Sequence, residues 1–114
     1  MQRIAFRLLV RKGKERAYDE AHRQVWPALL EEMEAMGIHD YSIFRRDREL
    51  FLYLKVHNWD EVREKLQASE VNAKWQQAMA EILEHHPDCG AYDTLEYFKE
   101  VFYLAGNPHQ GGIN

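Results

Sequence analysis

The 114-residue chain is 46% apolar and 30% charged, a balance typical of a folded globular protein rather than of a disordered or membrane-embedded one. Its net charge of −4 comes from interspersed acidic and basic residues, which offer no basic patch for nucleic acid. A chain of this length builds one hydrophobic core, so we expect one domain over residues 1–104 and a glycine-rich tail over residues 105–114.

The chain begins with an alternating pattern and continues with a helical one. Alternating apolar residues predict a strand over residues 3–10 with one buried face. The segment 14–37 has helical spacing, carries acidic residues near its start and ends at Gly37, a common left-handed C-cap. Pro27 lacks a backbone N–H and disfavours α geometry at the preceding residue, so the helix should kink there or divide into two pieces.

Two strand-like runs follow and predict a β-hairpin. They cover residues 41–45 and 50–56 and are joined by the charged residues 46–49, which suit a turn of about four residues. We therefore expect these two strands to be antiparallel neighbours.

The second half of the chain predicts two helices and a final strand. Asn58 can cap a helix that ends near residue 67, and helical spacing predicts another helix over about 69–84. Proline, aspartate and glycine predict a loop over residues 85–90. The aromatic-rich residues 95–104 predict the last strand.

The order βαββαβ indicates an α+β, ferredoxin-like fold with a four-stranded antiparallel sheet and helices on one face. This plan leaves the second face of the sheet open. Apolar and aromatic side chains such as Phe51, Tyr53, Phe98 and Phe102 are more than one helix layer covers. We therefore expect a homodimer, a dimeric αβ-barrel in which two sheets pack face to face.

The helical segment 14–37 carries a stripe of polar and aromatic side chains. Tyr18, His22 and Trp26 follow one another at four-residue intervals and share one side of the helix. The neighbouring stripe is apolar and is the face the helix should bury: Ala17, Ala21, Val25, Leu29 and Met33. Histidine is the common proton carrier near neutral pH, so His22 at the margin of the core is a candidate general acid. A partly exposed structural histidine is the competing interpretation.

Other aromatic side chains allow two interpretations each. Tyr18 and Tyr41 can hydrogen-bond a polyol, but half-buried tyrosines are also ordinary structural residues. Trp75 can stack on the apolar face of a sugar or simply fill the core.

Motifs for cofactors are missing from the sequence. The other histidines form no cluster with cysteine or carboxylate at metal-ligand spacing, and there is no G-x-G-x-x-G, P-loop or G-x-S-x-G motif. We expect no metal and no nucleotide cofactor.

The N-terminus and the cysteine content favour a cytoplasmic protein. No apolar run approaches the roughly 18 residues of a membrane span, and charges interrupt the N-terminal apolar stretch, unlike in a signal peptide. Cys89 is the single cysteine and cannot form an internal disulfide, which fits a reducing compartment. We expect no membrane partner.

Several of these residues together form a pattern that is typical of one protein family. They are Tyr18, His22, Val25-Trp26-Pro27, Gly37-x-His39-x-Tyr41, Trp75 and Glu100-Val101-Phe102-Tyr103-Leu104. In order and spacing the pattern resembles the L-rhamnose mutarotase family, and the resemblance covers residues 3–104. It implies a cofactor-free isomerase of the aldose 1-epimerase type, a homodimer that interconverts the α and β anomers of a 6-deoxyhexose.

The resemblance also implies roles for individual residues. His22 matches the family's proton donor, and Tyr18, Tyr41 and Trp75 match residues that contact the sugar. The family's usual Trp-Trp pair is Trp75-Gln76 here, so an amide takes the place of the second indole. Because polar groups discriminate between sugars by the hydrogen bonds they satisfy, Gln76 leaves the choice between L-rhamnose, L-fucose and a related sugar open.

Two other functions fit the same sequence. The βαββαβ plan also hosts cofactor-free monooxygenases and haem-degrading enzymes, because one fold supports many activities. A non-catalytic sugar-binding protein would bind the sugar without accelerating its anomer exchange.

Overall fold

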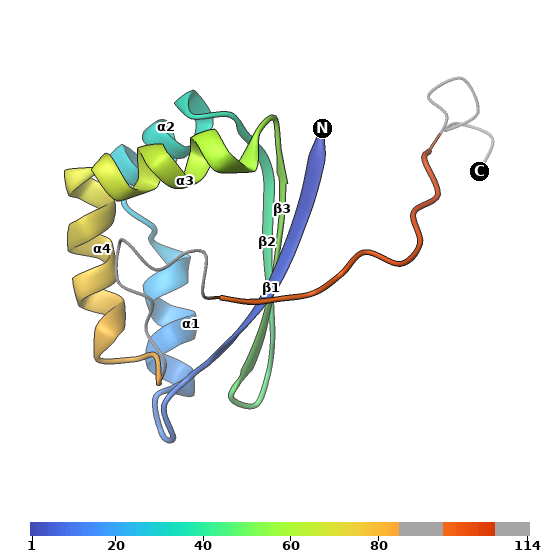
Figure 1. The fold of residues 1–114 in the computed structure, drawn as a ribbon. Helices are drawn as coiled ribbons and strands as arrows, with labels where there is room; N and C mark the ends of the chain where they lie inside the picture. Colours follow the sequence, from blue (N-terminus) through green and yellow to red (C-terminus); the bar gives the residue numbers. More distant parts are fainter. Residues whose placement is uncertain (85–94, 107–114) are drawn as a thin grey trace.

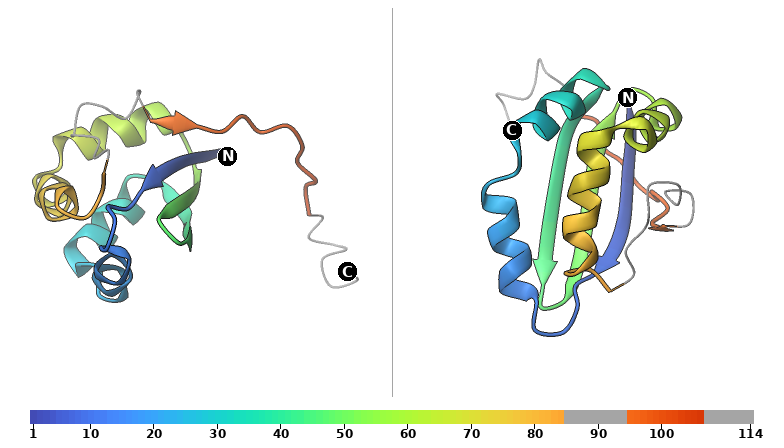
Figure 2. Two further views of the ribbon diagram at one scale, coloured as in Figure 1. Left: turned by 90° about the horizontal axis from the view of Figure 1, so that it is seen from below. Right: turned by 90° about the vertical axis from the view of Figure 1, so that its left-hand side faces the viewer.

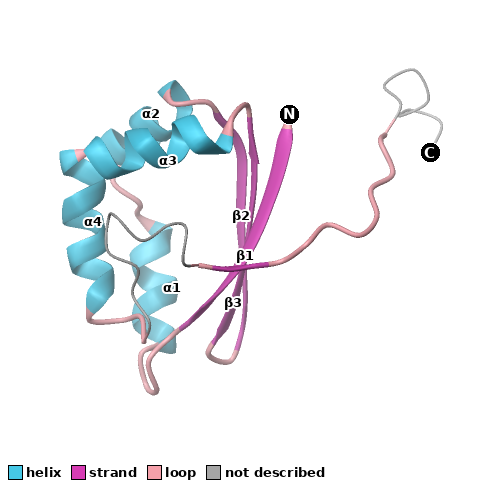
Figure 3. Cartoon of the chain, viewed as in Figure 1, coloured by secondary structure: helices cyan, strands magenta, loops and turns pink. Residues whose placement is uncertain are grey.

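The computed structural model describes residues 1–84 and 95–106, with four helices packed on one face of a four-stranded antiparallel sheet (Figures 1 and 3). In chain order the elements are β1 (Gln2–Leu9), α1 (Glu15–Arg23), α2 (Pro27–Ala35), β2 (Ile38–Arg46), β3 (Glu49–Val56), α3 (Trp59–Ala68), α4 (Glu70–Ala80) and β4 (Glu96–Tyr97). The strand order is β2-β3-β1-β4. The predicted ferredoxin-like α+β fold is confirmed. The predicted loop over residues 85–90, with Cys89, and the tail beyond residue 106 lie outside the described residues.

Pro27 divides the predicted long helix into two. α1 ends at Arg23, and Pro27 opens the first turn of α2. Trp26, the residue before it, has φ −58° and ψ 128°, the extended geometry that proline imposes on its predecessor. The two helices consequently run in different directions (Figure 1).

The β2–β3 hairpin is longer and tighter than predicted. β2 begins at Ile38 instead of residue 41, directly after Gly37, whose φ of 96° is left-handed as expected of a helix C-cap. Arg46 and Glu49 pair across the two strands and form an ion pair of 3.2 Å, so they belong to the ladder and not to the turn. Asp47, with φ 55°, makes the reversal, a conformation that aspartate tolerates.

The core lies between the helices and the sheet (Figure 2). Alternate residues of β3 point into it and are almost fully buried: Leu50, Leu52, Leu54 and Val56. The predicted apolar stripe of segment 14–37 is only partly buried, since Leu29 is inaccessible while Val25 and Met33 are half-buried. Tyr18, expected at the margin, is instead 4% exposed.

The fourth helix ends at Ala80, earlier than the predicted residue 84, because the chain turns back onto the end of β1. The backbone N–H of Glu84 donates to the carbonyl of Leu9 over 2.8 Å, and the N–H of Arg11 donates to the carbonyl of Ile82 over 2.7 Å. These bonds replace the next helical turn.

The final strand is much shorter than the predicted residues 95–104. Only Glu96–Tyr97 pair with β1, opposite Arg7 and Phe6. The segment after residue 98 then leaves the sheet and runs away from the helices (Figures 1 and 2). Its side chains Val101, Phe102 and Leu104 are 86%, 79% and 78% exposed. The aromatic-rich composition thus predicted a longer strand than the one that forms, and these side chains are not buried among the described residues.

Arg3 fixes the start of this extended segment. Its guanidinium donates to both carboxylate oxygens of Glu100, over 2.7 and 2.8 Å, and lies 3.3 Å from the centre of the Tyr103 ring. The neighbouring cation lowers the pKa of the Glu100 carboxyl. None of the described helices is long and apolar enough to cross a membrane.

An ion pair fixes α1 to the sheet. Nε and Nη2 of Arg45 on β2 contact the two carboxylate oxygens of Asp19 over 2.7 and 2.5 Å, and Nη1 donates to the carbonyl of Asp47 over 2.8 Å. Hydrogen bonds from Arg45 are the main reason why the pKa of Asp19 lies below its ordinary value. Asp19 precedes His22 by one helical turn, so the pair helps to set the position of that histidine.

We expect Leu29→Ala to lower the free energy of unfolding by about 2–5 kcal/mol, because it leaves a cavity at an inaccessible core position. Urea unfolding followed by circular dichroism measures the change. The matched control is Leu30→Ala, since Leu30 is 46% exposed and its truncation should cost less than about 1 kcal/mol. Equal losses in the two variants would contradict the core assignment.

Stability should fall in acid partly through Asp19. A carboxyl whose pKa is lowered by folding contributes stability above its unfolded value of ~3.9, and this contribution is lost as the pH falls through the folded value. We therefore expect the stability difference between the wild type and Asp19→Asn to shrink as the pH falls from about 5 to below 3. Urea midpoints across this range test it. Asp40→Asn, at an exposed position of β2, controls for the loss of one negative charge. A difference that stays constant with pH would contradict the role of the pair.

Candidate active site

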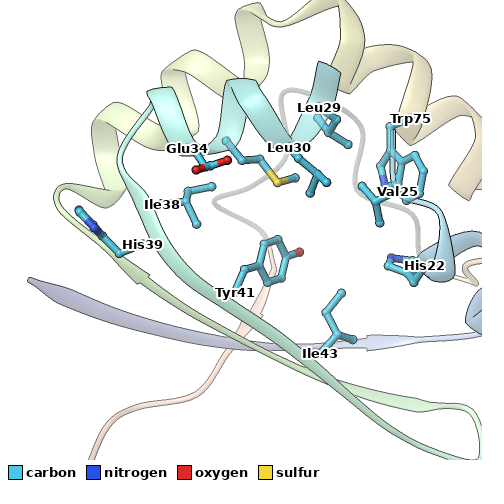
Figure 4. Close-up of a pocket in the computed structure, with 11 residues that line it drawn as sticks. His22, Val25, Leu29, Leu30, Glu34, Ile38, His39, Tyr41, Ile43 and Trp75 are labelled. Carbon is cyan, nitrogen blue, oxygen red and sulfur yellow. The ribbon is translucent and has the colours of Figure 1, made fainter. Parts of the chain in front are cut away.

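A pocket of about 360 Å³ lies between α1, α2, α4 and β2 (Figure 4). His22 and Trp75 stand together at one end, Tyr41 rises from β2 into the middle, and Glu34, Ile38 and His39 lie towards the other end (Figure 4). The rest of the wall is apolar: Val25, Leu29, Leu30, Met33 and Ile43. The volume is at the low end of the roughly 300–1,000 Å³ of small-molecule sites, which suits a compact ligand.

His22 is held in one orientation by its own helix. Its Nδ1 lies 2.9 Å from the carbonyl oxygen of Tyr18, one turn earlier. A carbonyl only accepts hydrogen bonds, so Nδ1 must carry the proton of this bond. Nε2 is therefore the ring nitrogen that can exchange a proton with a ligand in the pocket.

Two aromatic rings enclose the imidazole. The Tyr18 ring stacks on it at a centroid distance of 4.2 Å, and the Trp75 ring meets it edge-on at 5.4 Å. Trp26 meets Trp75 edge-on in turn, at 5.2 Å. These contacts, together with the bond to the Tyr18 carbonyl, restrict rotation of the His22 side chain.

Tyr18 lies beneath His22 and is not part of the pocket wall. Burial is the main cause that raises the pKa of its phenol, with smaller contributions from Tyr41 and Asp19. The phenol therefore stays protonated at any ordinary pH and can donate a hydrogen bond but cannot act as a base. Its predicted contact with a sugar stays a prediction.

Trp75 lies in the core and also lines the pocket. It is 8% exposed and belongs to the core, and the same indole forms a wall of the pocket beside His22. Tyr41 is 38% exposed and lines the pocket as predicted for a residue that can meet a ligand.

Gln76 lies on a smaller chamber behind the pocket. This chamber of about 60 Å³ shares Met33, Ile38 and Tyr41 with the pocket and is also lined by Asn72. Nε2 of Gln76 lies 3.4 Å from Oδ1 of Asn72. Of the predicted site residues, His22, Tyr41 and Trp75 thus line the pocket, Gln76 lines the adjacent chamber, and Tyr18 lines neither.

Sequence reasoning did not single out several residues of the wall. Leu30, Met33 and Glu34 occupy one stripe of α2. The two apolar residues cannot be told from core residues in a helical pattern, and a single glutamate on a helix gives no signal of a site. Ile43 could have been found, because it follows Tyr41 by two positions and therefore faces the same side of β2. Within residues 1–84 and 95–106 there is no group of three or more histidine, cysteine or acidic residues that could hold a metal ion.

The arrangement favours general acid–base chemistry on a compact polar ligand. It offers one oriented imidazole, a phenol on Tyr41 and an indole face, inside a wall that is mostly apolar. An indole face suits the apolar side of a sugar ring, and an imidazole suits proton transfer.

Comparison with known proteins agrees with this chemistry. The family model described as L-rhamnose mutarotase matches residues 3–104. An L-rhamnose mutarotase of Formosa agariphila is 34% identical over 91% of this chain and 99% of its own length. Those of Shouchella clausii and Bacillus subtilis are 36% and 34% identical, over 92% and 91% of this chain and 100% and 99% of their own lengths.

Solved structures give the same result. The crystal structure of the L-rhamnose mutarotase from Formosa agariphila superposes with a TM-score of 0.77 at 33% identity, covering 92% of this chain and all of the other. Tetracenomycin F2 cyclase from Streptomyces glaucescens covers 95% of this chain with a TM-score of 0.54, but at 17% identity this likeness shows the fold alone. With a family model that matches nearly its whole length, the chain belongs to the L-rhamnose mutarotase family.

Proposed function

We propose that this protein is a cofactor-free mutarotase that interconverts the α and β anomers of L-rhamnose, with L-fucose or a related 6-deoxyhexose as the alternative substrate. Family membership supports the reaction, and one observation in the pocket carries it: His22, with Nδ1 fixed on the Tyr18 carbonyl, lines a pocket that suits a monosaccharide. Residues 1–104 are proposed as the catalytic domain of a cytoplasmic enzyme.

The reaction needs one proton delivered and one removed. Protonated His22 gives the proton on Nε2 to the ring oxygen as the bond between that oxygen and C1 breaks. The anomeric hydroxyl loses its proton to water, and C1 becomes an aldehyde. Rotation about the C1–C2 bond presents the other face of the aldehyde, and the same steps in reverse close the ring as the other anomer.

The neighbouring residues are proposed to orient the sugar. Trp75 offers an indole face against which the apolar side of the ring can stack, and Tyr41 offers a phenol in the middle of the pocket. Because its pKa is raised, the phenol of Tyr18 does not accept the anomeric proton, which supports water as the acceptor. Tyr18 is proposed to support His22 from below through the stacked rings. The amide of Gln76 is proposed as the remaining contact.

Anomer exchange of L-rhamnose, measured by NMR saturation transfer, tests the function. The protein should accelerate exchange, and His22→Ala should reduce the acceleration by roughly 10²-fold or more, because a general acid is lost. His57→Ala is the matched control, since His57 is exposed, lines neither the pocket nor the chamber and should keep the activity.

Full activity of His22→Ala would refute the role of the imidazole. Binding of the sugar by the wild type without faster exchange would instead support a non-catalytic sugar-binding protein. A change in the absorbance spectrum of haem on mixing with the protein would support the haem-degrading alternative.

We further propose that the protein is a homodimer of sugar-binding subunits. The face of the sheet opposite the helices carries the large side chains Phe44, Phe51 and Phe98, which are 63%, 41% and 49% exposed. The extended segment after β4 exposes three more apolar side chains, Val101, Phe102 and Leu104. Monomers rarely expose large apolar patches, so these exposed side chains support a second copy as the partner of the sheet face and the segment.

Sedimentation analysis tests the dimer. Phe102→Ser should shift the protein towards the monomer, because the aromatic side chain is 79% exposed in the single chain and would lose its buried position in the dimer. Lys99→Ser, in the same exposed segment, is the control and should leave the dimer intact. A wild type that sediments as a monomer at micromolar concentration would contradict the proposal.

A further inference from the structure

We propose that Arg45 sets the pH range in which His22 can deliver its proton, by pairing with the carboxylate of Asp19 one helical turn before the histidine. This inference rests on the proposed mutarotase function and deepens it, because it names what controls the protonation of the acid. Arg45 acts through Asp19 and is not part of the pocket wall, so it is a positioning residue and not a catalytic one.

The first observation is the side of β2 from which Arg45 projects. Successive residues of a strand point to opposite faces, and Tyr41 and Ile43 both line the pocket. Arg45 follows Ile43 by two positions and continues the same face, whereas Arg46 belongs to the opposite face. From there the guanidinium reaches α1, where Nε and Nη2 contact the two carboxylate oxygens of Asp19 over 2.7 and 2.5 Å.

The second observation is that Asp19 and His22 are neighbours on α1. Residues three apart in a helix lie on the same side, with their Cβ atoms about 5–6 Å apart. Hydrogen bonds from Arg45 lower the pKa of the Asp19 carboxyl most, and His22 adds a smaller contribution of the same sign. Because electrostatic interactions are mutual, the charge of Asp19 acts on the imidazole in turn. An unpaired carboxylate at this place would therefore favour the protonated form of His22.

The third observation is that Arg45 opposes this effect of Asp19. The two side chains are 29% and 38% exposed, so water screens the pair only in part. Arginine keeps its proton at every pH at which histidine titrates. The pair therefore has a net charge near zero while both partners are present. Removal of one partner leaves the other charge uncompensated beside the imidazole, negative in one case and positive in the other.

Other charged groups around the pair stay the same when one of its partners is replaced. After Arg45 itself, Arg23 also lowers the pKa of the Asp19 carboxyl. Hydrogen bonds to Asp19 raise the pKa of Arg45, and the charges of Glu15 and Asp47 add to this. None of these neighbours is changed in the variants below, so a difference between the variants reports the pair.

The groups that face His22 from other elements stay the same as well. They are Tyr41 on β2, the indole of Trp75 on α4, which does not titrate, and, at the far end of the pocket, Glu34 on α2 and His39 on β2 (Figure 4). On α1 itself, the phenol of Tyr18 stays protonated because burial raises its pKa.

The pH dependence of anomer exchange tests the inference. Exchange of L-rhamnose is measured by NMR saturation transfer, with the spontaneous rate subtracted. Because protonated His22 is the acid, activity falls as the pH rises. Arg45→Gln should move this fall to higher pH by roughly 0.5 pH units, which is about threefold in rate above the midpoint. Asp19→Asn should move it to lower pH, and the double variant should lie between the two. High salt should reduce both shifts.

Two variants serve as controls for charge and for position. Arg45→Lys keeps the positive charge and should stay close to the wild type. Arg46→Gln removes a cation from the opposite face of β2, where the side chain is 87% exposed, and should leave the profile unchanged. A merely structural role of Arg45 would lower the rate without moving the profile.

A second measurement does not depend on activity. The imidazole C–H signal of His22 is assigned by its absence from the NMR spectrum of His22→Ala and is followed through a pH titration of each variant. The midpoint of this titration should move in the same directions as the activity profile, upward in Arg45→Gln and downward in Asp19→Asn.

The outcomes separate the two proposals. A wild type that does not accelerate exchange would overturn the mutarotase function, and the titration of the His22 signal would then decide on the pair. Equal midpoints in the wild type, Arg45→Gln and Asp19→Asn would overturn the role of the pair alone. Midpoints that move in the same direction in both variants would also overturn it, because that result indicates altered burial of the imidazole instead of an altered charge beside it.

Discussion

The break at Pro27 is the constraint on which the site depends. Because proline forces Trp26 into extended geometry, α1 ends just after His22, and α2 begins in a new direction (Figure 1). In one straight helix, the helical periodicity alone would determine the directions in which His22 and Leu30 point. The break instead lets both line one pocket, and it places Trp26 edge-on against Trp75, the indole that also contacts His22.

Anomer exchange requires only proton transfer, and the site contains one histidine that is oriented for it. Ring opening needs a correctly oriented proton carrier, and the orientation of His22 comes from the carbonyl of its own helix and from the rings of Tyr18 and Trp75. Burial of Tyr18 keeps its phenol protonated. We therefore propose that His22 transfers the proton and that Tyr41 only forms hydrogen bonds.

Patterns that depend on one element were predictable from the sequence, and those that depend on several were not. Alternation located β1, a strand-like run located β3, and the spacing of Tyr18 and His22 placed both on one side of α1, where their rings stack. The start of β2 was missed because its first residues, including His39, lack apolar alternation.

The site was predictable to a similar degree. His22, Tyr41 and Trp75 do line the pocket. The burial of Tyr18 and the contribution of Glu34 required the angle between α1 and α2, which the sequence leaves open once Pro27 breaks the helix.

The last strand shows a different limit, and it connects the site to the proposed assembly. Residues 95–104 have the composition of a buried strand, yet only Glu96–Tyr97 pair with β1 in the single chain. Leu95 nevertheless lines the chamber behind the pocket, and the hydroxyl of Tyr97 lies 3.1 Å from Nε1 of Trp59, which lines it too. The segment whose exposed residues favour a second subunit therefore begins at the wall of the chamber that holds Gln76. Formation of the proposed dimer would fix this segment and, through Leu95 and Tyr97, the shape of the chamber.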